Sequence, residues 1–126
     1  MIERLLLIGF GSGVGGILRY LVSTGAYKIF GRTFPYGTLC VNAIGSFLIG
    51  FLFVVLLERF NGIADQLRTL LIIGFLGGFT TFSAFSIETM NLLESADYYR
   101  GLLNIIISVV LCLGLTWIGM ILGRQL

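Results

Sequence analysis

The sequence predicts an all-α membrane protein with four membrane-spanning helices, and two observations carry this prediction. First, the 126 residues are 57% hydrophobic and only 11% charged, with a mean hydropathy of +1.03, whereas soluble domains are about 25% charged. Second, residues 33–57, 69–87 and 101–123 carry no charge, and residues 5–27 carry only Arg19. Because a helix of about 20 apolar residues crosses the hydrocarbon core, four spans account for most of the chain.

We expect the spans at about 4–28, 36–57, 68–92 and 100–123, in a single transmembrane domain over residues 1–126. No cleavage site of the Ala-x-Ala type follows the first apolar stretch, so we expect it to be retained as a span rather than removed as a signal peptide. A β-barrel is not expected, because barrel strands alternate polar and apolar residues and these runs do not.

The loops between the spans carry almost no charge bias. The side that holds both termini has Arg4, Arg59, Arg68 and Arg124, and the opposite side has Lys28, Arg32 and Arg100. Since the bias of Lys and Arg sets orientation, this balance leaves two readings: a weakly oriented chain, or dual topology with antiparallel pairing. Four short helices can hardly enclose a pathway on all sides, so we expect a homo-oligomer.

The composition argues against an enzyme and against a nucleic-acid partner. The chain has no His and offers no nucleophile–base pair or metal-ligand cluster. Its net charge of +2 is too small and too scattered for a nucleic-acid surface. Residues 11–16 match G-x-G-x-x-G, but no acidic residue lies between Glu3 and Glu58, which argues against a dinucleotide site.

The third span contains a segment that disfavours a regular helix. Gly77 and Gly78 are adjacent, and Thr80 and Thr81 follow at the expected mid-membrane depth. Non-helical backbone is tolerated there only inside protein or beside a wet cavity. One reading is a break that frees carbonyl oxygens to bind a hard cation. The other is a bent helix whose threonine side chains cap the gap.

Polar side chains are aligned inside the spans, because residues four apart share a helix face. The aligned rows are Thr38, Asn42 and Ser46 in the second span and Asn104, Ser108 and Cys112 in the fourth, while in the third span Thr81, Ser83, Ser86 and Thr89 lie among phenylalanines. These rows either form hydrogen bonds between helices or line a pathway.

The chemistry of these rows suits a small anion. Hydroxyl and amide groups donate hydrogen bonds, and phenylalanine rings of the third span present a positive edge. Arg19 is the one cation inside a span, and it either serves the vestibule of a pore or is structural. Glu88 lies toward one end of the third span, where we expect it to be paired or to face a polar vestibule.

Three segments resemble the Fluc (CrcB) fluoride channel family: residues 13–20, 37–50 and 74–88. The resemblance covers the whole chain, including its length and number of spans. It implies a fluoride-selective channel in the bacterial plasma (inner) membrane that exports fluoride passively and so reduces fluoride toxicity in the cytoplasm. It also implies an antiparallel, dual-topology homodimer whose third span is broken mid-membrane.

The resemblance assigns roles to particular residues. It places Asn42, Phe82, Phe85 and Ser108 in the fluoride pore, and a structural Na⁺ on the backbone carbonyls of Gly77 and Thr80. We also expect Thr38 and Ser83 in the pore, and Arg19 and Glu88 in a vestibule or structural role. Asn104 and Cys112 stand where the family more often has Tyr and a small residue, so their pore roles stay open.

The alternative is a small four-span, dual-topology multidrug or cation transporter. Such transporters use a membrane-embedded Glu in the first span, where this chain offers Arg19 and no acid. A noncatalytic scaffold subunit is a third reading, but it leaves the aligned polar rows unexplained.

Overall fold

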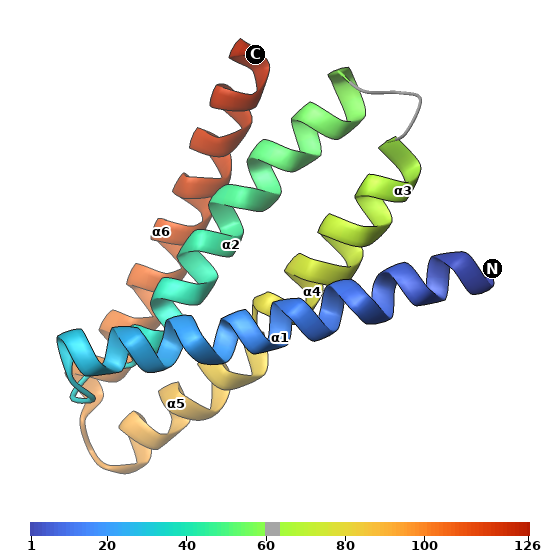
Figure 1. Cartoon of the computed structure of the whole chain (residues 1–126). Coiled ribbons are helices and arrows are strands. Elements are labelled where there is room, and N and C mark those ends of the chain that lie inside the picture. Colours follow the sequence, from blue (N-terminus) through green and yellow to red (C-terminus); the bar gives the residue numbers. More distant parts are fainter. Residues whose placement is uncertain (60–63) are drawn as a thin grey trace.

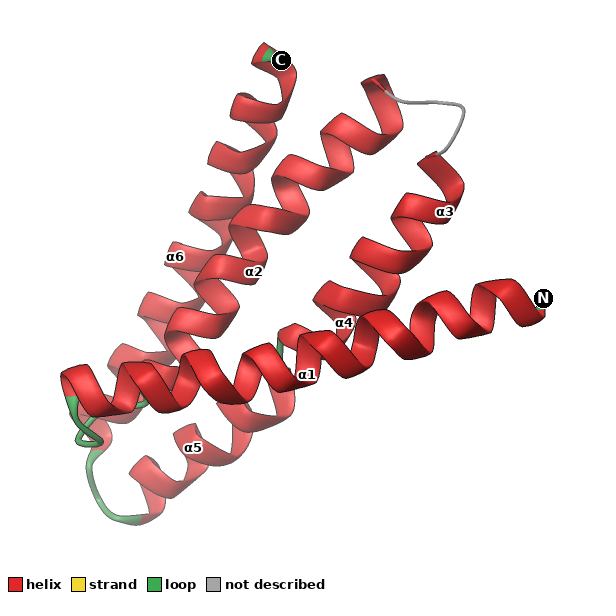
Figure 2. Ribbon diagram, in the orientation of Figure 1, coloured by secondary structure: helices red, strands yellow, loops and turns green. Residues whose placement is uncertain are grey.

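The computed structural model describes residues 1–59 and 64–126, and every regular element in them is helical (Figures 1 and 2). In chain order the elements are α1 (Ile2–Phe30), α2 (Tyr36–Val54), η1 (Val55–Arg59), α3 (Ala64–Arg68), η2 (Thr69–Leu76), α4 (Gly77–Phe79), α5 (Phe82–Glu94) and α6 (Tyr98–Gln125). The two η elements are π-helical. The loop expected between the second and third spans lies partly outside the described residues.

Four helical stretches are long and apolar enough to cross a membrane: Ile2–Phe30, Tyr36–Glu58, Asp65–Glu94 and Tyr98–Gln125. Each predicted span falls inside one of them, which confirms the all-α fold and the four spans. The helices extend past the predicted ends because both charged residues, such as Glu58 and Arg124, and apolar ones, such as Ile29 and Phe30, continue them.

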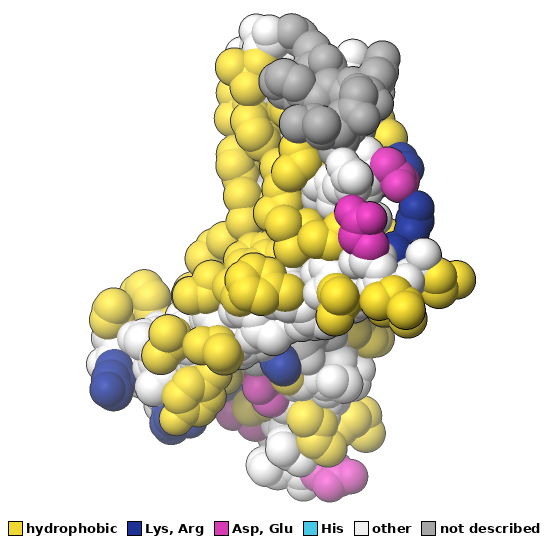
Figure 3. Space-filling model, turned by 45° about the vertical axis from the view of Figure 1, so that its right-hand side comes forward, with side chains coloured by type: hydrophobic (Ala, Val, Ile, Leu, Met, Phe, Trp, Pro, Cys, Tyr) yellow, Lys and Arg dark blue, Asp and Glu magenta, His cyan; other side chains and the backbone are white. Residues whose placement is uncertain are grey.

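The helices form a pair and a crossing layer (Figure 1). α2 and α6 run side by side, and α1 crosses the third span, which is built from α3, η2, α4 and α5. Both termini lie away from the loops at residues 31–35 and 95–97. Hydrophobic side chains cover a broad part of the face drawn in Figure 3, between groups of charged side chains.

Glycines bring the helix backbones into contact. A Cβ at Gly50 of α2 would overlap the carbonyl oxygen of Thr116, and one at Gly119 of α6 would overlap that of Phe47. On the other side of the molecule, a Cβ at Gly15 of α1 would overlap the Phe75 carbonyl. Small residues therefore set the distances between helices, as is common in membranes.

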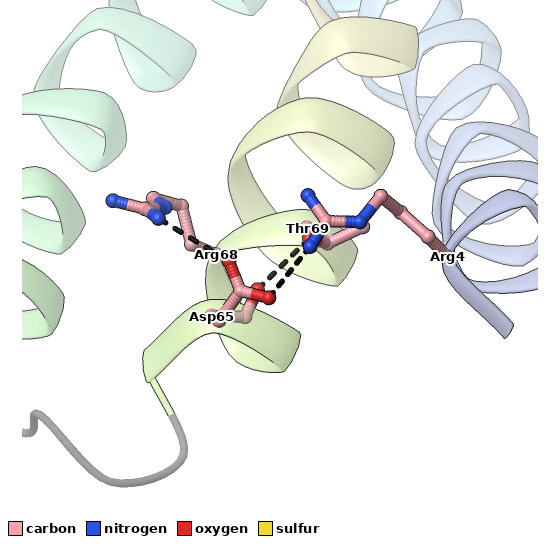
Figure 4. Close-up of polar contacts among 4 residues, drawn as sticks. All are labelled: Arg4, Asp65, Arg68 and Thr69. Carbon is pink, nitrogen blue, oxygen red and sulfur yellow. Dashed lines mark hydrogen bonds and ion pairs between the residues drawn. The ribbon is translucent and has the colours of Figure 1, made fainter. Parts of the chain in front are cut away.

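One ion pair joins α1 to the start of the third span, and a second lies within α3 (Figure 4). The Arg4 guanidinium lies 2.8 Å from the Asp65 carboxylate, and that of Arg68 lies 3.3 Å from it. Thr69 donates its hydroxyl to the Asp65 carbonyl at 2.8 Å. These charged side chains are about half exposed, so the pairs orient the ends of the two segments and contribute little to stability.

Candidate functional site

The third span is interrupted between α4 and α5. Thr80 (φ −83°, ψ 156°) and Thr81 (φ −150°, ψ 114°) both have extended backbone. The Thr80 hydroxyl donates to the Leu76 carbonyl at 2.9 Å. The Thr81 hydroxyl accepts from the Ala84 N–H at 3.2 Å and so caps α5. The two threonine hydroxyls thus bond backbone groups on both sides of the point where the helix is interrupted.

Asn42 of α2 pairs with both backbone groups of Thr81. Its Nδ2 donates to the Thr81 carbonyl at 2.9 Å, and the Thr81 N–H donates to its Oδ1 at 2.9 Å. An extended residue directs its own N–H and C=O to the same side, as in an antiparallel sheet, so one primary amide can meet both. The pairing fixes the interruption against α2.

The Gly77 and Thr80 carbonyls are among the groups at the interruption whose helical donors bond elsewhere. In a continuous helix the Thr81 N–H would bond the Gly77 carbonyl, and the Ala84 N–H would bond the Thr80 carbonyl. Here these donors go to Asn42 Oδ1 and to Thr81 Oγ1 instead. Gly77 and Thr80 are the pair that the family resemblance assigns to sodium. Carbonyl oxygens are suitable ligands for such a cation, so the residues present fit it.

A groove of about 520 Å³ lies beside the interruption, between α2, the third span and α6. Its walls are mainly apolar, with polar groups contributed by three spans. Of the predicted site residues, the groove is lined by Asn42, Gly77, Thr80, Phe82, Phe85 and Ser108. Ser46 and Cys112 line it as well. The groove therefore gathers most of the predicted pore and cation residues in one place.

Two phenylalanines stand at the start of α5. The ring centroids of Phe82 and Phe85 are 5.3 Å apart, with the ring planes inclined by 45°. Phe82 is 77% exposed, so the described part of its own chain leaves this large aromatic side chain largely uncovered. An exposed aromatic beside a groove is a surface for lipid or for another chain.

Four predicted site residues do not line this groove. Thr38 is buried and donates its hydroxyl to Glu88 Oε1 at 2.8 Å. The Ser83 hydroxyl lies 3.3 Å from the Thr81 hydroxyl. Arg19, on α1, is partly buried. Among the described residues, neither Arg19 Nε nor Glu88 Oε2 has a hydrogen-bond partner.

Asn104 connects α6 to α5 and does not line the groove. It is 2% exposed, donates to Thr89 Oγ1 at 2.8 Å and accepts from the Ser108 hydroxyl at 3.3 Å. Thr89 in turn donates to the Phe85 carbonyl at 2.7 Å. A chain of hydrogen bonds therefore runs from Ser108, in the groove wall, to the backbone beside Phe85.

Sequence reasoning missed the apolar part of the groove. The apolar lining includes Ile49, Ile72, Leu76, Val109 and Leu113. An aliphatic side chain that faces a groove has no sequence signal that distinguishes it from one that faces lipid, because both lie in apolar runs. Apart from Gly77, Phe82 and Phe85, only polar members of the wall were identifiable in advance.

Fold and site together define a four-span helical membrane protein with a polar-lined groove beside an interrupted span. Residues 6–120 match the family described as "CrcB-like protein, Camphor Resistance (CrcB)", and the chain belongs to this family. It is a multi-pass bacterial membrane protein.

Curated relatives match over nearly the full length. A protein of Coxiella burnetii (strain Dugway 5J108-111) named "Fluoride-specific ion channel FluC" is 52% identical over 123 residues, which cover 98% of this chain and 99% of the relative. A protein of the same name from Geobacter sulfurreducens is 49% identical over 122 residues, covering 97% of this chain and 98% of the relative.

Proposed function

We propose that this chain forms a fluoride-selective ion channel, which lets fluoride leave the cell passively and so lowers its toxicity in the cytoplasm. The observation that carries the proposal is the 52% identity, over 98% of the chain, to a relative named as a fluoride-specific ion channel. Conduction involves no covalent chemistry, so we assign the protein no enzymatic role.

The groove supports the proposal through its hydrogen-bond donors. Asn42 uses one amide hydrogen on the Thr81 carbonyl, which leaves the second for an anion. The ring edges of Phe82 and Phe85 join this amide along the wall, where Ser108 also lies with its hydroxyl hydrogen donated to Asn104 Oδ1. Neutral donors replace the hydration shell of a small anion without holding it too tightly to leave.

The other predicted residues surround this set. Thr38 and Ser83 are assigned to the polar surroundings of the pore, since neither side chain reaches the groove. Arg19 places a positive charge on α1, which raises the concentration of anions at an entrance. Glu88 is anchored by Thr38 at the vestibule and has a structural role there.

The working unit in this proposal is an antiparallel, dual-topology homodimer. The near-even balance of loop charges allows both orientations. The groove is open on one side, and Phe82 beside it is uncovered. Thr80 lies at the centre of the third span, Asp65–Glu94, which supports an interruption at mid-membrane depth. An antiparallel pair has its two-fold axis at that depth, so the two interruptions would meet there.

A structural Na⁺ at this meeting point completes the proposal. The carbonyls of Gly77 and Thr80 would hold it, because both have lost their helical donors. Two copies would supply four such oxygens. The ion would link the copies and leave the groove of each one free.

Efflux from liposomes tests the proposed function. Purified protein is reconstituted into vesicles loaded with potassium fluoride or potassium chloride, and efflux is followed with ion-selective electrodes after valinomycin is added. We expect rapid fluoride efflux and little chloride efflux. Absent fluoride movement, or movement coupled strictly to a proton or sodium gradient, would contradict a passive channel.

The second candidate, a four-span multidrug or cation transporter, is disfavoured by the same residues. The first span carries Arg19 and no acid to bind a proton or an organic cation. Coupled transport of a cation in the liposome assay is the outcome that would favour it.

A further inference from the structure

The Asn42–Thr81 pairing has a consequence for the carbonyl oxygens around it. We propose that Asn42 is a positioning residue: it holds the third span open at Thr81 and thereby keeps the Gly77 carbonyl available to a cation. The pairing itself stands on the geometry, and the link to a cation rests on the proposed function.

The Thr81 N–H has two possible acceptors in this fold. In a continuous helix it would bond the Gly77 carbonyl, four residues earlier. In the structure it donates to Asn42 Oδ1 at 2.9 Å, and the Thr81 carbonyl accepts from Asn42 Nδ2 at 2.9 Å. One side chain therefore satisfies both backbone groups of the residue that leaves the helix.

Removing Asn42 would leave both Thr81 groups without these partners in an apolar environment. Unpaired backbone groups are costly beside a groove whose walls are mainly apolar. Closure of the helix would give the Thr81 N–H a new acceptor, the Gly77 carbonyl. Such closure would withdraw that oxygen from a cation.

Loss of Asn42 would also shift the residues of α5 that we propose line the pore. α5 begins at Phe82, directly after Thr81, so its direction depends on the two extended residues before it. Asn42 also lines the groove with Phe82 and Phe85. One amide thus connects the proposed cation site with the proposed pore, and its loss would affect both.

The direct test follows Thr81 by NMR in protein labelled at threonine with ¹³C and ¹⁵N, reconstituted in lipid nanodiscs. In Asn42→Ala we expect the Thr81 Cα and Cβ shifts to leave the extended range, because its N–H loses Asn42 Oδ1 and turns to the Gly77 carbonyl. Shifts that stay in the extended range, whatever the rate of amide exchange, would overturn the proposal.

The second measurement is thermal stability of the detergent-solubilised protein as a function of sodium concentration. We expect Asn42→Ala to need about tenfold more sodium than the wild type for half of the stabilisation. Wild-type sodium dependence in this variant would overturn the link between Asn42 and the cation site.

Two control variants separate this role from pore lining. Ser46 lies one turn further along α2 in the same groove, and Thr81 bonds Asn42 rather than Ser46, so Ser46→Ala should keep the Thr81 signals and the sodium response. Phe82→Ile should lose fluoride flux and keep the sodium response. If Asn42→Ala behaves like Phe82→Ile, Asn42 is only a pore residue and our inference is wrong.

These results distinguish the inference from the proposed function. Normal fluoride flux in the wild type, with Thr81 and the sodium response unaffected in Asn42→Ala, overturns the positioning role and leaves the channel intact. A wild type without fluoride flux contradicts the channel, and a changed Thr81 signal in Asn42→Ala would still support the pairing. A wild type whose stability ignores sodium overturns the cation part of the inference.

Discussion

The α2–α6 pair and the third span contain similar residues, yet the paired helices are continuous and the third span is interrupted. Both contain glycines and threonines among aliphatic side chains. α2 and α6 are each continuous where they pack together, whereas the third span passes from α3 through η2 and α4 to an interruption before α5. The difference lies in how these residues are spaced and in what they meet.

In the α2–α6 pair, glycines and threonine add contacts to intact helices. Gly50 and Gly119 each face a carbonyl of the other helix, and Thr116 donates to the Ser46 carbonyl at 2.9 Å. In the third span the polar groups replace helical bonds. Asn42 and the Thr81 hydroxyl take the N–H groups that would have continued the helix. Isolated glycines and threonines let continuous helices pack closely. Where such residues are adjacent, a side chain can accept a backbone N–H and so interrupt the helix.

The largest expected effect tests the close packing of the pair. In Gly119→Ala the new Cβ would overlap the Phe47 carbonyl, so we expect a loss of about 2 to 3 kcal/mol in the free energy of unfolding, measured by titration with SDS. Gly114→Ala, on the same helix, is the control, since a Cβ there meets nothing within 4 Å. Equal losses in the two variants would refute the close contact as the cause.

The comparison also shows what the sequence determines. The four spans were predictable because charge-free runs of helical length have few alternatives in a membrane. The irregular segment at Gly77 to Thr81 was predictable because two glycines and two β-branched residues are adjacent. The π-helical geometry of η2 was not, since its run Thr69–Leu76 has no residue that separates it from an ordinary helix.

The sequence also does not predict which side chains contact one another. Helical periodicity places Thr38 and Asn42 on one face of α2, but it does not say what that face meets. In the structure Thr38 donates to Glu88, and Asn42 pairs with Thr81. Asn104 and Ser108 likewise share a face, yet Asn104 is buried against Thr89 and only Ser108 reaches the groove. These outcomes depend on the tilt of neighbouring helices.

A smaller effect is expected where the pair meets the third span, at Asn104. In Asn104→Leu the hydroxyls of Thr89 and Ser108 lose their partner, so we expect about 1 to 2 kcal/mol less stability against SDS. Because Asn104 orients Ser108, we also expect slower fluoride efflux. Asn91→Leu, at an exposed position on α5, is the control. Wild-type efflux with a lowered stability would show that Asn104 serves packing alone.

The smallest effects are expected when one hydroxyl is removed from the third span and one from the α2–α6 pair. In Thr81→Val the Ala84 N–H loses its cap acceptor, so we expect a loss of about 1 kcal/mol. In Thr116→Val the Ser46 carbonyl keeps its own helical donor, and hydrogen bonds between membrane helices contribute only about 0.6 kcal/mol. Both values come from the same SDS titration, and only Thr81→Val should also slow fluoride efflux. An equal loss of efflux in both variants would contradict this comparison. A hydroxyl that replaces a helical acceptor, as in Thr81, would then matter no more for conduction than one that adds a bond to an intact helix, as in Thr116.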